Sequence, residues 1–417
     1  MRGGGGPAAG WRHPGWSWAV RYGGAVGVGW TVSGLLLGAA LGGVYSLATG
    51  DLSNGGTQVQ LWLTVGLTVV AAGIAAWCLV AVLGAGRVRS RNGTAYIIRE
   101  QAQGWARDDA EGFLTESRRQ FARVIEVPGP VALDSGWDWP LDDGAAAWDR
   151  KVDELAVAFR ALHLDAGAAT PSGIFMWAWW SVAMAFGMRV TAAERGLSLD
   201  VWQRPSDGRT AQEAPVPWAS RPHAFGDALG PALASPVTPR TFSWPVRLTV
   251  SPGSRPGSGL PAGAPGDVAV LLVRVGRKPW GGIPDAGLTP EPEPGREYDL
   301  DVRDVAGACA GGKAPAELHE LRYDLPIGTV PWHDFPALVT ACADWIERTA
   351  SKLAGRTLLL GTVVPAEVAL GIGIRAGRAN RAGWPSHLWP LQHSADGLVV
   401  PRLNLGVARL DSSDGGA

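Results

Sequence analysis

Residues 358–394 read LLLGTVVPAEVALGIGIRAGRANRAGWPSHLWPLQHS, and this stretch decides the fold class. Its first residues form a continuous apolar run, which is typical of a strand buried on both faces of a parallel sheet. Pro365 stands where a helix begins. The predicted elements are a helix over 337–352, a strand over 357–361, a helix from Ala366 to about Arg381 and a strand over 386–391. This order indicates a parallel α/β layer with helical crossovers.

The same plan occurs about 190 residues earlier in the chain. The apolar run over 174–188 is too short for a comfortable membrane crossing, so it is expected to be a buried helix. The soluble part is therefore predicted to be one duplicated α/β unit. The earlier elements are a helix over 152–162, a weakly apolar strand over 161–169, a helix over 172–195 and a strand over 197–203; between the copies, strands are predicted over 242–250 and 267–275.

Two N-terminal stretches, 24–48 and 61–85, carry no charge, and each is long enough to cross a hydrocarbon core of about 30 Å as a helix. The loop between them has Asp51 as its one charge. Arginines flank the pair on both outer sides: Arg2, Arg12 and Arg21 before it, and Arg87, Arg89 and Arg91 after it. This pattern predicts a two-helix hairpin with both termini in the cytoplasm.

Two features of this region leave alternatives open. A cleaved signal peptide is the other interpretation of the first stretch, although a second span follows within a dozen residues. Gly34, Gly38 and Gly42 recur at every fourth position, a spacing that lets helices approach closely, but glycine is also common throughout the chain. The residues over 92–124 mix charges at helical spacing and are interpreted as a solvated helical connector.

Composition excludes several classes of protein. Of 417 residues, 46% are apolar and 18% charged, and the net charge of −1 gives no electrostatic argument for duplex nucleic acid as a partner. Three cysteines lie far apart without metal-ligand spacing, which excludes a disulfide scaffold and disfavours a zinc site. The nucleophile-elbow, zincin and phosphate-loop motifs do not occur, and His319 and Glu320 are adjacent and so face different ways. We therefore expect no catalytic site, no metal and no enzyme activity.

The stretch over 358–394 resembles the closing half of SAVED domains, and residues 148–410 resemble the whole domain, which consists of two fused CARF-like Rossmann units. Two N-terminal spans joined to such a domain resemble the membrane effectors of CBASS antiphage defence. The resemblance implies a bacterial inner-membrane protein without a cofactor that senses a cyclic di- to tetranucleotide made by a partner nucleotidyltransferase. It also implies ligand-induced homo-oligomers that disrupt the lipid bilayer. A membrane-anchored nucleotide-dependent enzyme and a passive membrane-anchored scaffold remain the alternatives.

The resulting division of the chain has five parts. They are a cytoplasmic segment over 1–23, the transmembrane hairpin over 24–86, the connector over 87–147, the SAVED-like sensor over 148–410 and a tail over 411–417.

Ligands of open α/β sheets lie beyond the carboxyl ends of the strands, where helix N-termini carry partial positive charge. The turn over 361–364 and its expected counterpart over 169–172 are therefore predicted to lie beside the ligand. Tryptophan suits base stacking and arginine suits phosphate, although ordinary packing and solvated strand ends are the alternatives. The predicted ligand-binding residues are Thr170, Ser172, Trp202, Gln203, Arg204, Arg277, Lys278, Thr362, Val363, Gln392 and His393.

Two further patterns near this site have structural interpretations. Arg274 and Trp280 are expected to extend the basic, aromatic rim that Arg277 and Lys278 begin. Gly371, Gly373 and Gly377 fall inside a helix and not in its preceding turn, so we expect them to allow close helix–sheet packing and not phosphate binding.

Overall fold

The computed structural model describes Gly34, Gly38 and residues 57–99, 114–115, 117–127, 148–166, 172–193, 199–202, 240–252, 267–275, 280, 297–304, 306, 308–309, 311–323, 335–379, 384–394 and 397–406. The chain divides into two compact units, Met1–Gly93 with Gln120–Ala122, and Thr94–Arg119 with Arg123–Ala417. The rest of the predicted first span over 24–48 and the tail over 411–417 lie outside the described residues.

The first unit contains one long described helix, α3 (Thr57–Asn92), which includes the whole of the predicted second span. The helical prediction for that span is thus confirmed. Its sequence carries no charge before Arg87. Five of its apolar side chains are 45–69% exposed, namely Val65, Val69, Val70, Leu79 and Val80. Among the described residues, no helix combines the length and hydropathy that a membrane crossing requires.

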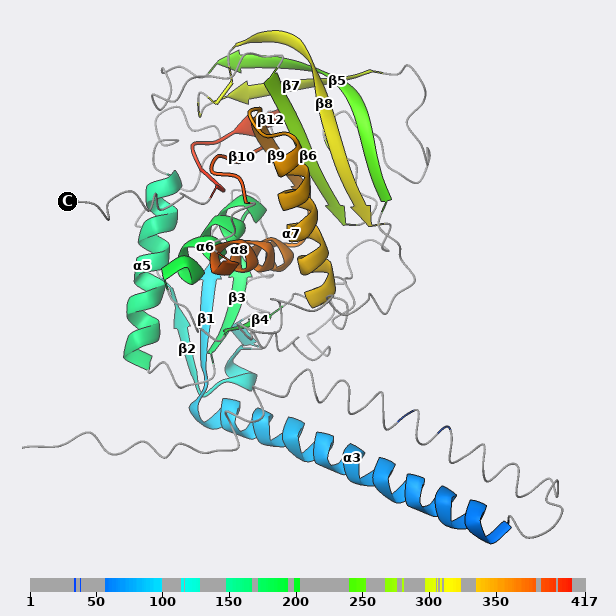
Figure 1. The fold of residues 1–417 in the computed structure, drawn as a ribbon. Coiled ribbons are helices and arrows are strands. Elements are labelled where there is room, and N and C mark those ends of the chain that lie inside the picture. The colour runs from blue at the N-terminus through cyan, green and yellow to red at the C-terminus, as the bar shows by residue number, and fades with distance from the viewer. Residues whose placement is uncertain are drawn as a thin grey trace, which may run out of the picture. The chain divides into compact units, whose positions relative to one another are not determined.

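The second unit begins with a four-stranded sheet in which every neighbouring pair is parallel, in the order β2-β1-β3-β4 (Figure 1). Its strands are β1 (Thr94–Arg99), β2 (Arg123–Glu126), β3 (Ser172–Trp177) and β4 (Leu199–Trp202). The prediction of a solvated helical connector over 92–124 is therefore wrong at its start. Residues 95–98 of β1 are at most 3% exposed, because a central strand buries both faces and needs only a short apolar run.

The first copy of the repeat is shifted by one element from its prediction. The helix predicted over 152–162 is α5 (Trp148–Ala166), so the strand predicted over 161–169 is wrong. Residues 172–177, predicted as the start of a helix, form β3, and α6 (Trp180–Ala193) follows it. A short, fully buried apolar run satisfies a strand and a helix equally well, and all six residues of β3 are buried.

The second unit also contains an eight-stranded mixed sheet in the order β10-β9-β6-β8-β5-β7-β12-β11. Two pairs, β5 with β8 and β11 with β12, are antiparallel. The strand predicted over 386–391 is observed only as the two-residue strand β10. Four strands of this sheet, β7, β8, β11 and β12, are additional to the prediction. The elements are β5 (Arg240–Pro252), β6 (Val268–Val275), β7 (Tyr298–Asp304), β8 (Gly312–Tyr323), α7 (Phe335–Lys352), β9 (Thr357–Val363), α8 (Ala366–Ala379), β10 (Trp389–Pro390), β11 (Gln392–Ser394) and β12 (Gly397–Val400).

Part of this sheet repeats the topology of the smaller sheet. The four strands β8-β6-β9-β10 are all parallel, as are β2-β1-β3-β4. Along the chain, β1, β2, α5, β3, α6 and β4 correspond to β6, β8, α7, β9, α8 and β10. The predicted duplication of one α/β unit is confirmed at the level of topology. We call the copy with the four-stranded sheet the first half and the copy with the eight-stranded sheet the second half.

The core lies on both faces of the eight-stranded sheet. Odd-numbered residues of β6 such as Leu271 join the core shared by α5 to α8 and the four-stranded sheet. Even-numbered residues such as Leu272 join a second core that contains Trp244 and Tyr298. The strands β10 and β11 occupy opposite edges of the sheet although Leu391 alone separates them. The sheet must therefore curl until its edges meet, which encloses the second core.

The stability of the chain at alkaline pH is expected to depend on buried acidic side chains, of which Cys309 and Tyr96 are two. Burial, assisted by the charge of Asp304, raises the pKa of the Cys309 thiol from 9.0 to about 12. Burial also raises the pKa of the Tyr96 phenol from 10.0 to about 12. Because the unfolded chain loses these protons first, their contribution is complete below about pH 9 and declines toward pH 12, by about 1.4 kcal/mol per pH unit for each group.

Thermal unfolding of the full chain between about pH 8 and about pH 10.5 measures this decline. We expect Cys309→Ala to show a shallower fall in melting temperature than the wild type. A wild-type melting temperature that stays constant over this range would contradict the assignment.

Candidate functional site

The candidate site is formed where α6 of the first half packs directly on α8 of the second half, in the layer between the two sheets (Figure 1). A methyl group added at Gly373 would lie 2.0 Å from the backbone oxygen of Met184, and one added at Gly377 would lie 2.4 Å from that of Met188. From the first contact to the second, the residue number rises by four in both helices, so the two helices run in the same direction. Their N-termini therefore lie at the same end, within about one helical turn of one another.

The glycines thus allow close packing between helices and not the helix–sheet packing that we predicted. Gly187 of α6 likewise allows close packing against α8, since a methyl group there would lie 2.5 Å from the backbone oxygen of Leu370. The Thr191 hydroxyl donates a hydrogen bond of 3.2 Å to the backbone oxygen of Ile374, which ties α6 to α8. Gly361, in contrast, faces the indole of Trp280, which a methyl group would approach to 2.3 Å.

Each of the two helix N-termini follows the carboxyl end of a parallel strand. In the first half, β3 ends at Trp177 and α6 begins at Trp180; in the second half, β9 ends at Val363 and α8 begins at Ala366. The first amide groups of a helix lack partners within the helix and give that end partial positive charge. Two such ends side by side, at the carboxyl edge of two parallel layers, form a position that favours an anionic ligand.

Two buried side chains join the halves at this edge. The hydroxyl of Ser181, in the first turn of α6, donates a hydrogen bond of 3.2 Å to Oε1 of Gln392 in β11. Gln392 is a predicted ligand-binding residue, and its Nε2 also donates to the backbone oxygen of its neighbour His393 over 3.4 Å. The structure therefore brings Gln392 to the N-terminus of α6, whereas the contribution of Ser181 was not predicted.

Thr362 lies near the carboxyl end of β9, on the face that carries Leu360 toward the helices. Its side chain is 6% exposed, and its hydroxyl has no hydrogen-bond partner within the described part of the chain. A buried hydroxyl without a partner costs about 1–3 kcal/mol. Among the described residues, Thr362 therefore offers a hydrogen-bonding group beside the N-terminus of α8. Val363, the next predicted residue, faces the opposite way and packs against the second core.

Tyr323, at the end of β8, was not predicted but belongs to the same edge. Val273 of β6 is the register partner of Thr362, and Val275 of β6 is that of Tyr323, so the two hydroxyl-bearing residues lie on either side of β6. The Tyr323 side chain is 1% exposed, and its hydroxyl, like that of Thr362, is unpartnered within the described residues. Burial raises the pKa of this phenol, so it is a neutral hydrogen-bond donor at neutral pH.

Several other predicted site residues lie elsewhere. The turn predicted over 169–172 is wrong as a strand-to-helix turn, because Ser172 begins β3 and the turn into α6 is formed by residues 178–179. Ser172 lies 3.3 Å from Nδ1 of buried His163, at the amino end of its strand. Trp202 ends β4, and His393 is an exposed residue of β11. Thr170, Gln203, Arg204, Arg277 and Lys278 lie outside the described residues.

The prediction that Arg274 and Trp280 belong to a basic, aromatic rim is wrong, because both side chains are buried. Nε of Arg274 lies 3.0 Å from Oε1 of Glu320, which also binds the guanidinium of Arg322 through both carboxylate oxygens. The indole of Trp244 donates to the same carboxylate over 2.9 Å. This cluster belongs to the interior of the curled sheet. Among the described residues, no group of histidine, cysteine and carboxylate side chains is arranged to hold a metal ion.

The fold and the site together define an α/β protein of two related halves whose common edge favours an anion. No protein family model matches the chain, and no curated protein matches it. Among solved structures it is similar to the Acinetobacter baumannii Cap4 SAVED/CARF-domain receptor with the cyclic trinucleotide 3'3'3'-cAAA, at 10% identity and a TM-score of 0.38, covering 84% of this chain and 61% of that one.

A second structure of this receptor matches at 10% identity and a TM-score of 0.35, over 84% of this chain and 60% of that one. The receptor with 2'3'3'-cAAA matches at 10% identity and a TM-score of 0.35, over 86% and 63%. The chain therefore spans about three fifths of the length of these receptors.

Proposed function

We propose that the second unit is a receptor for a small cyclic oligonucleotide, which binds at the paired N-termini of α6 and α8. The observation that carries this proposal is the parallel packing of these helices. It sets two partial positive charges beside the buried hydroxyl of Thr362, which has no partner among the described residues. The ligand class is the one that the sequence resemblance implies. We assign the chain no catalytic step.

A cyclic oligonucleotide suits this edge because it presents several phosphates on one compact ring. Each helix N-terminus provides backbone amides for one phosphate. Thr362 and Tyr323 provide hydroxyl donors on the second half, and Ser181 and Gln392 provide polar groups where the halves meet. A ligand that contacts both halves has different affinities for different arrangements of those halves, which is what a receptor needs in order to switch.

We further propose that the N-terminal hairpin, with spans over 24–48 and 61–85, lies in the inner membrane and that ligand-induced homo-oligomers disrupt the lipid bilayer in antiviral defence. A partner nucleotidyltransferase would supply the ligand. The support is the uncharged sequence of both spans, the arginines on their outer flanks and the exposed apolar side chains of α3. Gly34 and Gly38 are helical, and a methyl group at either would meet nothing within 4 Å, which leaves room for a neighbouring helix.

The topology proposal places both ends of the chain in the cytoplasm. A phosphatase reporter that is active in the periplasm alone, fused after Ala417, is expected to stay inactive, while the same reporter inserted after Asp51 is expected to be active. Activity of the fusion after Ala417 would contradict this topology.

The ligand-site proposal is tested by Thr362→Val, which keeps the shape of the side chain and removes its hydroxyl. We expect ligand affinity to fall about tenfold, because a hydrogen bond to a charged or polar ligand group is lost. The melting temperature should stay the same or rise, since the variant removes a buried hydroxyl that has no partner in the described chain. Isothermal titration and thermal unfolding of the purified full chain measure the two effects.

Thr340→Val is the matched control, because the hydroxyl of Thr340 is also buried and unpartnered within the described residues but belongs to α7, which is not one of the paired helices. We expect it to leave affinity unchanged. If Thr362→Val binds ligand within twofold of the wild type, Thr362 does not contact the ligand.

A further inference from the structure

The last described residues, 401–406, form a segment that we call the C-terminal strap. Leu403 and Leu405 are fully buried in the core that the two halves share. Leu405 of the strap makes two hydrogen bonds to the second half: the indole of Trp384 donates to its backbone oxygen over 2.9 Å, and its amide donates to the backbone oxygen of Leu388 over 2.8 Å. The strap is therefore a packed part of the fold.

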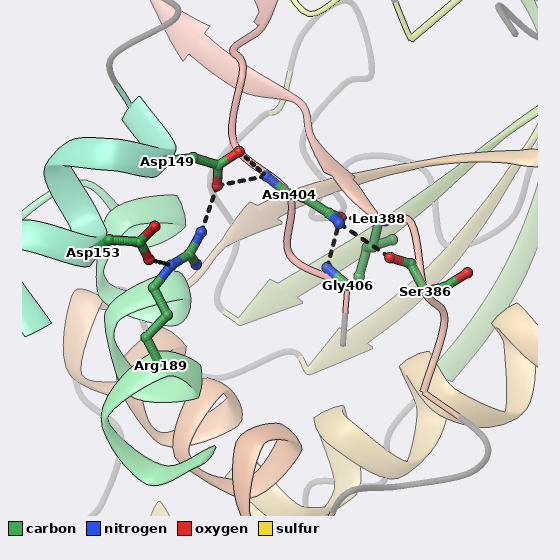
Figure 2. Close-up of polar contacts among 7 residues, drawn as sticks. All are labelled: Asp149, Asp153, Arg189, Ser386, Leu388, Asn404 and Gly406. Atoms are coloured by element: carbon green, nitrogen blue, oxygen red, sulfur yellow. Dashed lines mark hydrogen bonds and ion pairs between the residues drawn. The ribbon is translucent and has the colours of Figure 1, made fainter. Parts of the chain in front are cut away.

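Asn404 fixes the middle of the strap through both ends of its amide side chain (Figure 2). Its Oδ1 accepts hydrogen bonds from the backbone amides of Leu388, at 3.2 Å, and Gly406, at 2.8 Å. Its Nδ2 donates to the backbone oxygen of Ser386 over 3.1 Å. The backbone at Gly406 packs so closely on Ser386 that a larger residue would not fit, since a methyl group there would lie 1.9 Å from the same oxygen of Ser386.

The strap also reaches the first half. The backbone amide of Asn404 donates to both carboxylate oxygens of Asp149 in α5, at 3.2 and 3.4 Å. The same carboxylate pairs with the guanidinium of Arg189 in α6, and Arg189 also pairs with Asp153, one turn further along α5. Figure 2 shows Asp149 between its two partners, with Asp153 on the far side of Arg189. Asp149 is thus shared between the strap and α6.

Arg189 is next to Met188, whose backbone contacts Gly377 of α8. A shift of α6 against α8 must therefore move the guanidinium that holds Asp149, and with it the carboxylate that holds the strap. Partial burial raises the pKa of Asp149 even though Arg189 lies beside it, so the partners of this half-exposed carboxylate help to keep it charged.

We propose that the C-terminal strap is a latch between the two halves, closed by Asp149, and that ligand binding at the paired helix N-termini opens it by moving α6. The second part of this proposal rests on the proposed function, whereas the first part does not. An open latch would release residues 403–406 and let the halves rearrange. A ligand can drive this change because it binds the open arrangement more tightly.

The latch is tested by amide hydrogen exchange in the full chain, solubilised in detergent, with Asp149→Ala and the matched control Asp153→Ala. Both variants remove one carboxylate from Arg189, but Asp149 alone of the two contacts the strap. We expect exchange over residues 403–406 to accelerate at least about tenfold in Asp149→Ala and less than about twofold in Asp153→Ala. Equal exchange in the two variants would overturn the latch.

Asn404→Ala loosens the latch from the other side, because it removes the three side-chain hydrogen bonds that hold the strap in position. The backbone amide that donates to Asp149 and the pair of Asp149 with Arg189 remain in place. We expect the same acceleration over 403–406. If Asp149→Ala fails to fold, Asn404→Ala serves as the test, and unchanged amide exchange over residues 403–406 in Asn404→Ala would overturn the latch.

The ligand step is tested by adding cyclic trinucleotides to the wild type and to Asn404→Ala. We expect the bound ligand to accelerate exchange over 403–406 in the wild type, and Asn404→Ala to bind about three- to tenfold more tightly because its latch is already weakened. Binding without a change in exchange would overturn the ligand step. Failure of every cyclic oligonucleotide to bind would overturn the proposed function and the ligand step together, while the variant comparison would still decide the latch.

Discussion

Gly373→Ala is expected to destabilise the second unit by about 3 kcal/mol or more, near the upper end of the cost of overpacking. The added methyl group would lie 2.0 Å from a backbone oxygen of α6, and a backbone atom in the middle of a helix cannot turn aside as a side chain can. The helices must separate, and the paired N-termini must separate with them. We expect a lower melting temperature together with loss of ligand binding.

The control is Gly73→Ala in α3, where a methyl group would meet nothing within 4 Å. There the intrinsic preference of alanine for helix, about 1 kcal/mol, acts alone, so the substitution should be neutral or stabilising. If Gly373→Ala unfolds at the wild-type temperature, α6 and α8 do not pack as described, and the candidate site loses its geometric basis.

Glu320→Gln is expected to cost about 3–5 kcal/mol, because it leaves the guanidinium groups of Arg274 and Arg322 without the carboxylate between them. All three side chains are at most 2% exposed. Glu317→Gln is the matched control on the same strand: its carboxylate is 46% exposed and pairs with Arg356 at the surface, so its loss should cost at most about 1 kcal/mol. Urea denaturation of both variants measures the difference.

A triple variant distinguishes two possible causes of the lost stability: unpaired buried charge, and loss of the packing of the three side chains. The combined substitution Arg274→Met, Glu320→Leu and Arg322→Met removes all three charges and keeps apolar volume, so it should recover most of the stability lost in Glu320→Gln. A triple variant that is less stable than Glu320→Gln would show that the ion cluster itself, and not the absence of unpaired charge, stabilises the curled sheet.

The elements that could be predicted are those whose burial pattern is simple. The strand β5 alternates and buries Trp244, Val246 and Leu248, while β6 and β9 are continuous apolar runs. The strand β8 escaped prediction because its buried face carries Glu320 and Arg322, which resemble surface residues until their mutual pairing is known. The strand β3 was taken for a helix because a fully buried strand has no alternation to distinguish it.

The candidate site could be predicted in part, for a related reason. Thr362 and Gln392 follow or end predicted strands, so the rule that ligands bind at strand carboxyl ends identified them. Ser181 and Tyr323 depend on how α6 meets α8 and on the unpredicted strand β8, which are properties of tertiary packing. Gly373 and Gly377 were visible in the sequence, but the sequence did not show that the helix α6 is what they contact.

Direct titration of the purified full chain with cyclic di-, tri- and tetranucleotides, each beside its linear form, tests the central claim most directly. Because the two halves of one chain form one site, we predict that at least one cyclic compound binds with one molecule per chain and a Kd at or below about 1 µM, and that its linear form binds at least about tenfold more weakly. The absence of binding by every cyclic compound, or equal binding of the cyclic and linear forms, would contradict the account.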